Sequence, residues 1–456
     1  MRIFLSLLAV AVATATGATV QPAAPQQPLS PTERQIVSYV DADNERGLVL
    51  LEQAVNINSG TMNFAGVRQV GRIFRAELDA LGFATRWVDG EPFQRAGHLV
   101  AVRSGERRQG PQGPQGPHLL LIGHLDTVFE RDSPFQRYEL LDDSTARGPG
   151  VTDMKGGNVI IVQALKALDA VGALESMSIT VVMTGDEERT GGPLDLARAA
   201  LIEAAEAADF AIAFEDGDGD PRTAVVARRG FTGWELRVTG RPAHSSQIFR
   251  DDIGAGAIYE VARILNGFYE RMAGERYLTF NPGLMLGGTS IDFDTAQARG
   301  IAFGKDNVIA EHAVVSGDLR TISIEQLEGA QAKMRAIVAE HLPHTSAELR
   351  FRQSYPPMAP TEGNERLLGL FDQVSLDLGF GPVTAVDPRA AGAADVSFTA
   401  GLVEMAIDGL GLMGSGGHTV GETADLRTLP MQTKRAAVLL YRLMRARGEG
   451  AGAGAD

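Results

Sequence analysis

Short apolar segments that alternate with helical patterns are the feature of this sequence that most constrains its fold. Apolar segments of strand length occupy residues 83–88, 98–103, 118–122, 179–183 and 210–214, and helical patterns occupy 32–55, 65–81 and 158–168. A strand that is apolar along its whole length is buried on both faces, which requires helices on each side of the sheet. The alternation therefore predicts an α/β fold in which helices flank a sheet.

The pattern changes near residue 231, where features of an antiparallel sheet begin. Residues 234–238 alternate like a half-buried strand, and 253–272 fit an amphipathic helix. Strands at 277–286, 308–319 and 347–355 and a helix at 324–342 follow, before the α/β pattern resumes and ends in a helix at 431–447. Because 456 residues exceed what one core usually absorbs, we expect a catalytic domain interrupted by a smaller α+β domain. The expected division is a signal peptide at 1–18, a linker at 19–31, the catalytic domain at 32–228 and 346–447, the smaller domain at 229–345, and a disordered tail at 448–456.

The N-terminus has the composition of an export signal. Arg2 precedes an apolar run at 3–12, and small residues continue to Ala18. The run is too short for a membrane span, so the pattern favours a signal peptide that is removed when the protein is secreted or enters the periplasm. A hydrophobic tail without structure is the alternative interpretation.

Charge and cysteine content exclude several classes of function. The formal net charge of -15 argues against nucleic acid and anionic membrane as partners, since both attract clustered Lys and Arg. The chain has no cysteine, which excludes disulfides, thiol nucleophiles and cysteine-bound zinc. A metal would have to be held by His, Asp and Glu, and this donor set is typical of catalytic sites.

Two adjacent carboxylates follow the apolar strand at 179–183. In the run Gly-Asp-Glu-Glu at 185–188, Glu187 and Glu188 come where the strand ends, so their side chains can approach one point from two directions. One could then hold a metal while the other moves a proton. Taken alone, the run is more typical of a solvated acidic loop.

Four further segments place His, Asp or Glu at strand ends or in glycine-rich turns. They carry His124 and Asp126, Asp153, Glu215, and His418. Each has a simpler interpretation by itself: a hydrogen-bonded loop histidine, an N-cap, a solvated acid or a surface histidine. Ligands bind at the carboxyl ends of strands in open α/β sheets, so together with the acidic pair these residues predict a metal site there. Imidazole and carboxylate suit Zn²⁺, Mn²⁺ or Co²⁺, and a carboxylate between two such ions is the arrangement of two-metal hydrolases.

Five motifs, in order, resemble the M20 family of metallopeptidases, which includes glutamate carboxypeptidases, aminoacylases and succinyl-diaminopimelate desuccinylase. They are the segments 124–126, 153–157 and 185–188 together with Glu215 and His418. The resemblance implies a zinc-exopeptidase-type catalytic domain with a mixed sheet, interrupted by a lid or dimerisation domain. It also implies that Asp153 bridges two zinc ions, with His124 and Glu215 completing one site and Glu188 and His418 the other. Glu187 would be the general base, Asp126 would steady His124, and the Asp153–Met154 peptide would be cis.

The smaller domain carries three residues that match the family's lid. His244 matches the histidine that stabilises the oxyanion, usually in the partner subunit's site, although alone it resembles an ordinary turn histidine. Asn307 and Arg320 match residues that hold the substrate's carboxylate, a task that suits the planar guanidinium, and a surface ion pair is the alternative for Arg320. The sequence departs from the family at 391–395, where Ala-Gly-Ala-Ala-Asp replaces the usual Gly/Ser-rich run.

These observations predict an exported dizinc carboxypeptidase that releases a C-terminal amino acid, glutamate-like by the resemblance, and forms a homodimer through its lid domain. An aminoacylase (an N-acyl-amino-acid amidohydrolase) or a dipeptidase with the same residues is the alternative. The expected partner is a small peptide or an N-acyl-amino acid, with no nucleic acid and no membrane after signal cleavage. A binding protein without catalysis is a hypothesis of another class, which the complete set of Glu187 and five ligands argues against. A purely structural metal site is a further hypothesis.

Overall fold

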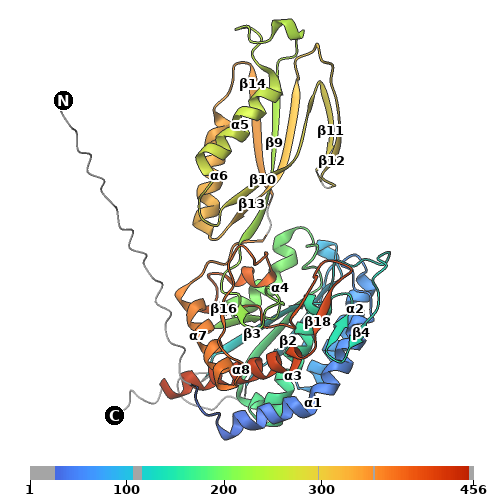
Figure 1. Ribbon diagram of the computed structural model, residues 1–456, viewed down its shortest axis with the longest axis vertical. Helices are drawn as coiled ribbons and strands as arrows, with labels where there is room; N and C mark the ends of the chain where they lie inside the picture. Colours follow the sequence, from blue (N-terminus) through green and yellow to red (C-terminus); the bar gives the residue numbers. More distant parts are fainter. Residues whose placement is uncertain (1–25, 106–115, 296, 353–354, 451–456) are drawn as a thin grey trace, which may run out of the picture.

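The structure, a computed structural model, describes residues 26–105, 116–295, 297–352 and 355–450 and consists of two bodies joined by two crossings of the chain (Figure 1). The expected signal peptide at 1–18, the expected linker up to residue 25 and the expected tail from residue 451 lie outside the described residues. Residues 448–450, which were expected in the disordered tail, belong instead to the C-terminal helix. None of the helices in the described part of the chain is both long and apolar enough to cross a membrane.

A six-stranded mixed sheet lies at the centre of the larger body, in the order β1-β2-β6-β3-β7-β16. β3 pairs in parallel with β6 and β7, and β7 with β16, whereas β2 is antiparallel to β1 and β6. The carboxyl ends of β3, β6 and β7 therefore meet at one edge of the sheet. The strands are β1 (Ala84–Asp89), β2 (Gly97–Arg103), β3 (His118–His124), β6 (Ser178–Thr184), β7 (Phe210–Ala213) and β16 (Met405–Ile407).

Helices cover both faces of this sheet because its central strands are apolar on both faces. Along β3, Leu119 and Leu121 belong to one buried cluster, and Leu120 and Ile122 belong to another on the opposite face. α4 (Leu194–Glu206) covers the second face, and the first face packs against α1 (Pro31–Val55), α2 (Phe64–Ala80), α3 (Gly157–Ala170), α7 (Glu362–Asp377) and α8 (Thr428–Gly450). The predicted α/β fold with a mixed sheet is confirmed. The helices α4 and α7 were not expected from the sequence.

Two smaller sheets complete the larger body. β8 (Thr223–Ala224) pairs with β15 (Thr384–Ala385), and four short strands form a sheet in the order β17-β18-β5-β4. These four are β4 (Glu139–Asp142), β5 (Thr145–Arg147), β17 (Gly414–Ser415) and β18 (Thr423–Asp425). Because β18 pairs with β5, the turn at 416–422 that carries His418 lies beside the segment that carries Asp153.

The second body is an α+β unit with its own core. Its antiparallel sheet has the order β10-β13-β9-β14, and α5 and α6 cover one face of it (Figure 1). Trp234, Leu236 and Val315 are fully buried between this sheet and the helices. β14 pairs with β9, so the body extends to Arg352, beyond the boundary expected at 345. Its elements are β9 (Gly230–Gly240), α5 (Gly256–Met272), β10 (Thr279–Gly288), β11 (Ser290–Asp294), β12 (Arg299–Phe303), β13 (His312–Thr321), α6 (Ile324–Ala339) and β14 (Thr345–Arg352).

Candidate metal centre

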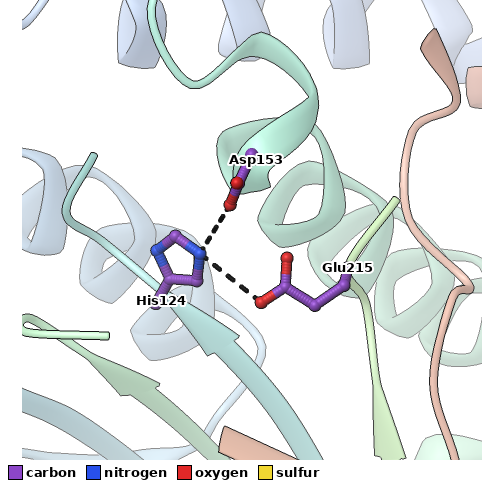
Figure 2. Close-up of side chains that lie close together, drawn as sticks. All are labelled: His124, Asp153 and Glu215. Carbon is purple, nitrogen blue, oxygen red and sulfur yellow. Dashed lines mark hydrogen bonds and ion pairs between the residues drawn. The ribbon is translucent and has the colours of Figure 1, made fainter. Parts of the chain in front are cut away.

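Three side chains from distant parts of the chain meet at the carboxyl edge of the central sheet (Figure 2). His124 is the last residue of β3, Asp153 lies in a short helical turn (Val151–Gly156), and Glu215 follows the end of β7. His124 Nε2 lies 2.9 Å from Asp153 Oδ1 and 3.5 Å from Glu215 Oε1. Burial by itself would lower the pKa of His124, but the neighbouring carboxylates, Glu215 foremost, raise it well above its ordinary value. The three side chains form one potential ligand group.

A second group shares Asp153 with the first. His418 Nε2 lies 2.9 Å from Asp153 Oδ2 and 3.2 Å from Glu188 Oε2. Within each group, one ligand atom per residue can be chosen so that all lie within 4.8 Å of one another. Asp153 thus directs one oxygen to each group, which is what a bridging ligand requires. The Asp153–Met154 peptide is cis, as the resemblance implies.

Asp126 connects His124 to the acidic pair. Its carboxylate lies 3.4 Å from His124 Nδ1 and accepts hydrogen bonds from Glu187 N at 3.1 Å and Glu188 N at 3.2 Å. It also accepts a bond of 2.6 Å from the hydroxyl of Thr61. His124 Nδ1 also forms a hydrogen bond of 3.1 Å with the backbone carbonyl of Asp126. Asp126 is fully buried, so these contacts hold the imidazole and the backbone of both glutamates in fixed relation to one another.

The carboxyl groups of this centre outnumber the two histidines that contact them, His124 and His418. Burial raises the pKa of Glu187 and Glu215 well above the ordinary value and that of Glu188 to about 7. Glu188 Oε1 is also buried without a hydrogen-bond partner among the described residues. Divalent cations would satisfy this oxygen and offset the charge, and imidazole with carboxylate is a donor set that Zn²⁺, Mn²⁺ and Co²⁺ accept. The residues therefore fit a pair of divalent metal ions.

Glu187 lies beside these groups but belongs to neither. It follows β6 next to Glu188, yet its carboxyl group is in neither set of potential ligands. Its backbone is held on both sides, by Asp126 at the N–H and by the Tyr355 hydroxyl, which donates a bond of 3.0 Å to the carbonyl. A carboxyl group that is positioned in this way and free of the ligand groups can accept and release a proton.

The sequence profile of Peptidase family M20/M25/M40 matches residues 120–444, a range that includes both ligand groups. The chain belongs to this family. Carboxypeptidase G2 of Pseudomonas sp. (strain RS-16) is 27% identical over 420 residues, which cover 90% of this chain and 93% of that protein. Succinyl-diaminopimelate desuccinylase of Gluconacetobacter diazotrophicus is 26% identical over 390 residues, which cover 82% and 91%.

Solved structures of M20 peptidases share the fold. Aminopeptidase PepT from Bacillus cereus matches with a TM-score of 0.66 at 16% identity, over 88% of this chain and 98% of that one. An M20 family metallo-carboxypeptidase from Sulfolobus solfataricus matches with a TM-score of 0.60 at 15% identity, over 88% and 99%. Family membership and the two ligand groups together make this M20 peptidase a metal-dependent hydrolase of amide or peptide bonds.

The three predicted lid residues lie at opposite ends of the second body. Arg320 pairs across β13 and β9 with Phe231, close to the crossing, and its guanidinium carbon lies 5.3 Å from the centre of the Phe231 ring. His244 and Asn307 lie together beyond the far end of β9, where Ser245 N donates to Asn307 O. The 11 residues of β9 span roughly 33 Å. The structure therefore brings Arg320 towards the metal centre of its own chain, but not His244 or Asn307.

Glu422 supports the metal centre and was missed by the sequence analysis. It is fully buried and accepts hydrogen bonds from Gly150 N at 3.0 Å, Thr152 N at 2.9 Å and Asp153 N at 3.3 Å. The Thr152 hydroxyl donates a fourth bond, of 3.2 Å. Glu422 thus holds the segment that carries the shared ligand. Its short separation from His418 was the only signal in the sequence, because three of these four hydrogen bonds come from backbone groups.

An ion pair that supports Glu215 was also missed. Arg228 Nη2 lies 2.6 Å from Asp408 Oδ2, and both side chains are buried. Asp408 Oδ1 in turn accepts a hydrogen bond of 3.1 Å from Glu215 N. The pair therefore orients the segment after β7 from which Glu215 projects.

Proposed function

We propose that this M20 peptidase is a dizinc carboxypeptidase that hydrolyses the amide bond to a C-terminal amino acid. The observation that carries the proposal is the position of Asp153, with one oxygen at each ligand group, beside a Glu187 that belongs to neither group. The similarity to Carboxypeptidase G2 over most of both chains supports the carboxypeptidase assignment. An aminoacylase or a dipeptidase is the alternative, since desuccinylases are similar to the chain over almost the same length.

Each residue of the centre has a distinct task in this reaction. Zinc ions held by His124, Glu215, Glu188, His418 and the shared Asp153 would polarise the scissile carbonyl and lower the pKa of the attacking water. Glu187 would accept the water proton at a carboxyl oxygen and pass it to the leaving amine. Burial raises its pKa, which brings proton exchange closer to neutral pH.

Substrate orientation would come from the lid. Arg320 presents a guanidinium near the crossing, where it would bind the terminal carboxylate of the peptide by two parallel hydrogen bonds. Its bond to Asp318, of 3.0 Å, holds the side chain in place but leaves it partly exposed. In the same proposal, His244 and Asn307 would complete the metal centre of a partner subunit, because they lie at the far end of the lid.

A homodimer would therefore be the active form. The outer face of α5 exposes Ile258, Tyr259 and Tyr269, which offers an apolar surface for a second copy. We also propose export with cleavage near Ala15 or Ala18, on the composition of residues 1–18. Sedimentation of the purified protein tests the dimer, and N-terminal sequencing of the protein released by a bacterial host tests the cleavage.

A substrate comparison tests the proposed activity. The protein loaded with Zn²⁺ is assayed on N-benzoylglycyl-amino acids, N-acetyl-amino acids and unblocked dipeptides. We expect the first class to be hydrolysed with the highest kcat/KM. A preference of more than about tenfold for N-acetyl-amino acids would favour the aminoacylase alternative. Absence of hydrolysis in all three classes would contradict the proposal.

A further inference from the structure

A cavity of about 370 Å³ opens beside the acidic pair. Leu194, the first residue of α4, forms part of its wall, and the two crossings between the bodies supply Phe231 and Tyr355. Glu187 and Glu188 border it on the side of the metal centre. Its volume lies within the range of pockets that hold small organic groups.

The two hydroxyl groups in this wall, those of Thr190 and Tyr355, donate to other groups of the protein. The Thr190 hydroxyl donates to the Tyr355 oxygen at 3.2 Å. The Tyr355 hydroxyl lies 3.0 Å from Glu187 O and 3.1 Å from Asp395 Oδ1, so its single proton is directed away from the cavity. A carboxylate that entered the cavity would find no partner among these hydroxyl groups and would leave water without compensation.

Positive charge is also absent from the described lining of the cavity, which contains neither Lys nor Arg. Arg198 lies behind Tyr355, but it is fully buried and its guanidinium is engaged by Asp186 at 2.6 Å and Asp395 at 2.9 Å. Asp395 belongs to the segment 391–395 that departs from the family pattern. An acidic side chain in the cavity would thus meet carboxyl groups, with no Lys or Arg in the described lining to pair with it.

The position of Arg320 indicates which part of a substrate the cavity receives. Phe231 lines the cavity on one side, and the Arg320 guanidinium carbon lies over the same ring at 5.3 Å from its centre. A terminal carboxylate held by Arg320 would therefore leave the side chain of the same residue beside the cavity. The C-terminal residue is the part of the substrate that fits.

We propose that this cavity is the pocket for the side chain of the C-terminal residue and that it selects apolar or aromatic side chains over glutamate. The inference rests on the proposed carboxypeptidase function and changes its expected substrate, since the resemblance implies a glutamate-like leaving residue. Leu194, Phe231 and the Tyr355 ring supply apolar contact for such a side chain.

The test measures kcat/KM of wild-type protein, fully loaded with zinc, for three substrates: N-benzoylglycyl-Phe, -Leu and -Glu. We expect kcat/KM for Phe and Leu to exceed that for Glu by at least about tenfold. A preference for Glu, with hydrolysis intact, would overturn the pocket assignment and leave the carboxypeptidase function standing. Absence of hydrolysis of all three would overturn the function and the inference with it.

Two variants on α4 sharpen the test. Leu194→Arg places a cation in the wall and should shift the Glu-to-Phe ratio of kcat/KM towards Glu by about tenfold or more. Leu196→Arg adds the same charge at a side chain that is 46% exposed and outside the cavity, and should leave the ratio unchanged. Zinc content and circular dichroism verify that both variants are folded. Equal Glu-to-Phe ratios of kcat/KM in the two folded variants would overturn the inference. If Leu194→Arg does not fold, the comparison of the three substrates with wild-type protein decides.

Discussion

Replacement of Glu422 should lower both the stability of the protein and its metal affinity, although Glu422 belongs to neither ligand group. The carboxylate accepts three backbone hydrogen bonds and one hydroxyl bond from residues 150–153, the segment that carries the shared ligand Asp153. Glu422→Ala would leave these donors buried and unpaired. Glu422→Gln keeps the shape and one oxygen acceptor, but turns an amide N–H towards Gly150 N or its neighbours.

The expected cost follows from the hydrogen bonds that are lost. A buried donor without a partner costs about 1–3 kcal/mol, so three backbone donors would lower the free energy of unfolding by about 3–5 kcal/mol once water has entered part of the space. Burial raises the pKa of Glu422, which shows that the charge itself is not favoured there, so loss of the charge offsets part of the penalty. Glu422→Gln should therefore cost only about 1–2 kcal/mol, for the bond that becomes repulsive.

Thermal melting and metal titration measure the two consequences separately. At about 2 °C per kcal/mol, the midpoint should fall by about 6–10 °C in Glu422→Ala and by about 2–4 °C in Glu422→Gln, with metal-free protein as the sample. Metal affinity at 20 °C, where the variants are still folded, should fall by roughly 10–100-fold in Glu422→Ala, as it does when residues that orient ligands are removed.

Glu139→Ala is the matched control. Glu139 is exposed on β4 of the same small sheet, where its ion pair with Arg147 has a length of 3.5 Å and little expected stability. This variant should melt within about 1 °C of the wild type and bind metal unchanged. If Glu422→Ala matched this control in both measurements, the hydrogen bonds to residues 150–153 would not position Asp153.

Three further predictions concern the ligands and the substrate. Glu187→Gln should keep both metal ions and lower kcat by roughly 10²–10⁴-fold because an amide cannot take the water proton, whereas Glu188→Gln should lose metal; equal metal loss in the two variants would contradict this division. Arg320→Ala should raise KM for peptides with a free C-terminus by roughly tenfold to a hundredfold, from the loss of a charge-assisted hydrogen bond, and steady-state kinetics with unchanged KM would remove Arg320 from carboxylate binding. Hydrogen bonds to Asp153 and Glu188 raise the pKa of His418 to about 11, so in metal-free protein this imidazole is protonated at pH 7 and a metal must displace the proton. Metal affinity should therefore increase with pH around neutrality, and calorimetry in buffers of different ionisation enthalpy should detect proton release; its absence would refute the argument.

Five of the six strands of the central sheet, all except β16, and the order of the chemical groups could be predicted because both are local properties. An apolar run such as 118–122 specifies a buried strand, and a His, Asp or Glu directly after such a run has to lie at the edge of the sheet. α4 escaped prediction because its buried face consists largely of small side chains, including Ala197, Ala200 and Ala204, which give a weak periodic signal.

The sequence by itself determined that this chain is an α/β protein with His, Asp and Glu at the ends of its strands. The family resemblance implied how these groups divide, but only the tertiary structure has the geometry, in which Asp153 turns one oxygen to each ligand group and Glu187 stands outside both. The role of Glu422 and the cavity at Tyr355 also became visible only in the tertiary structure. The backbone groups that the side chains of Glu422 and Tyr355 contact are more than a hundred residues away in the chain. The physical reason is that hydrogen bonds to backbone groups and the walls of a pocket depend on positions in space, and backbone N–H and C=O groups are the same in every residue that has them.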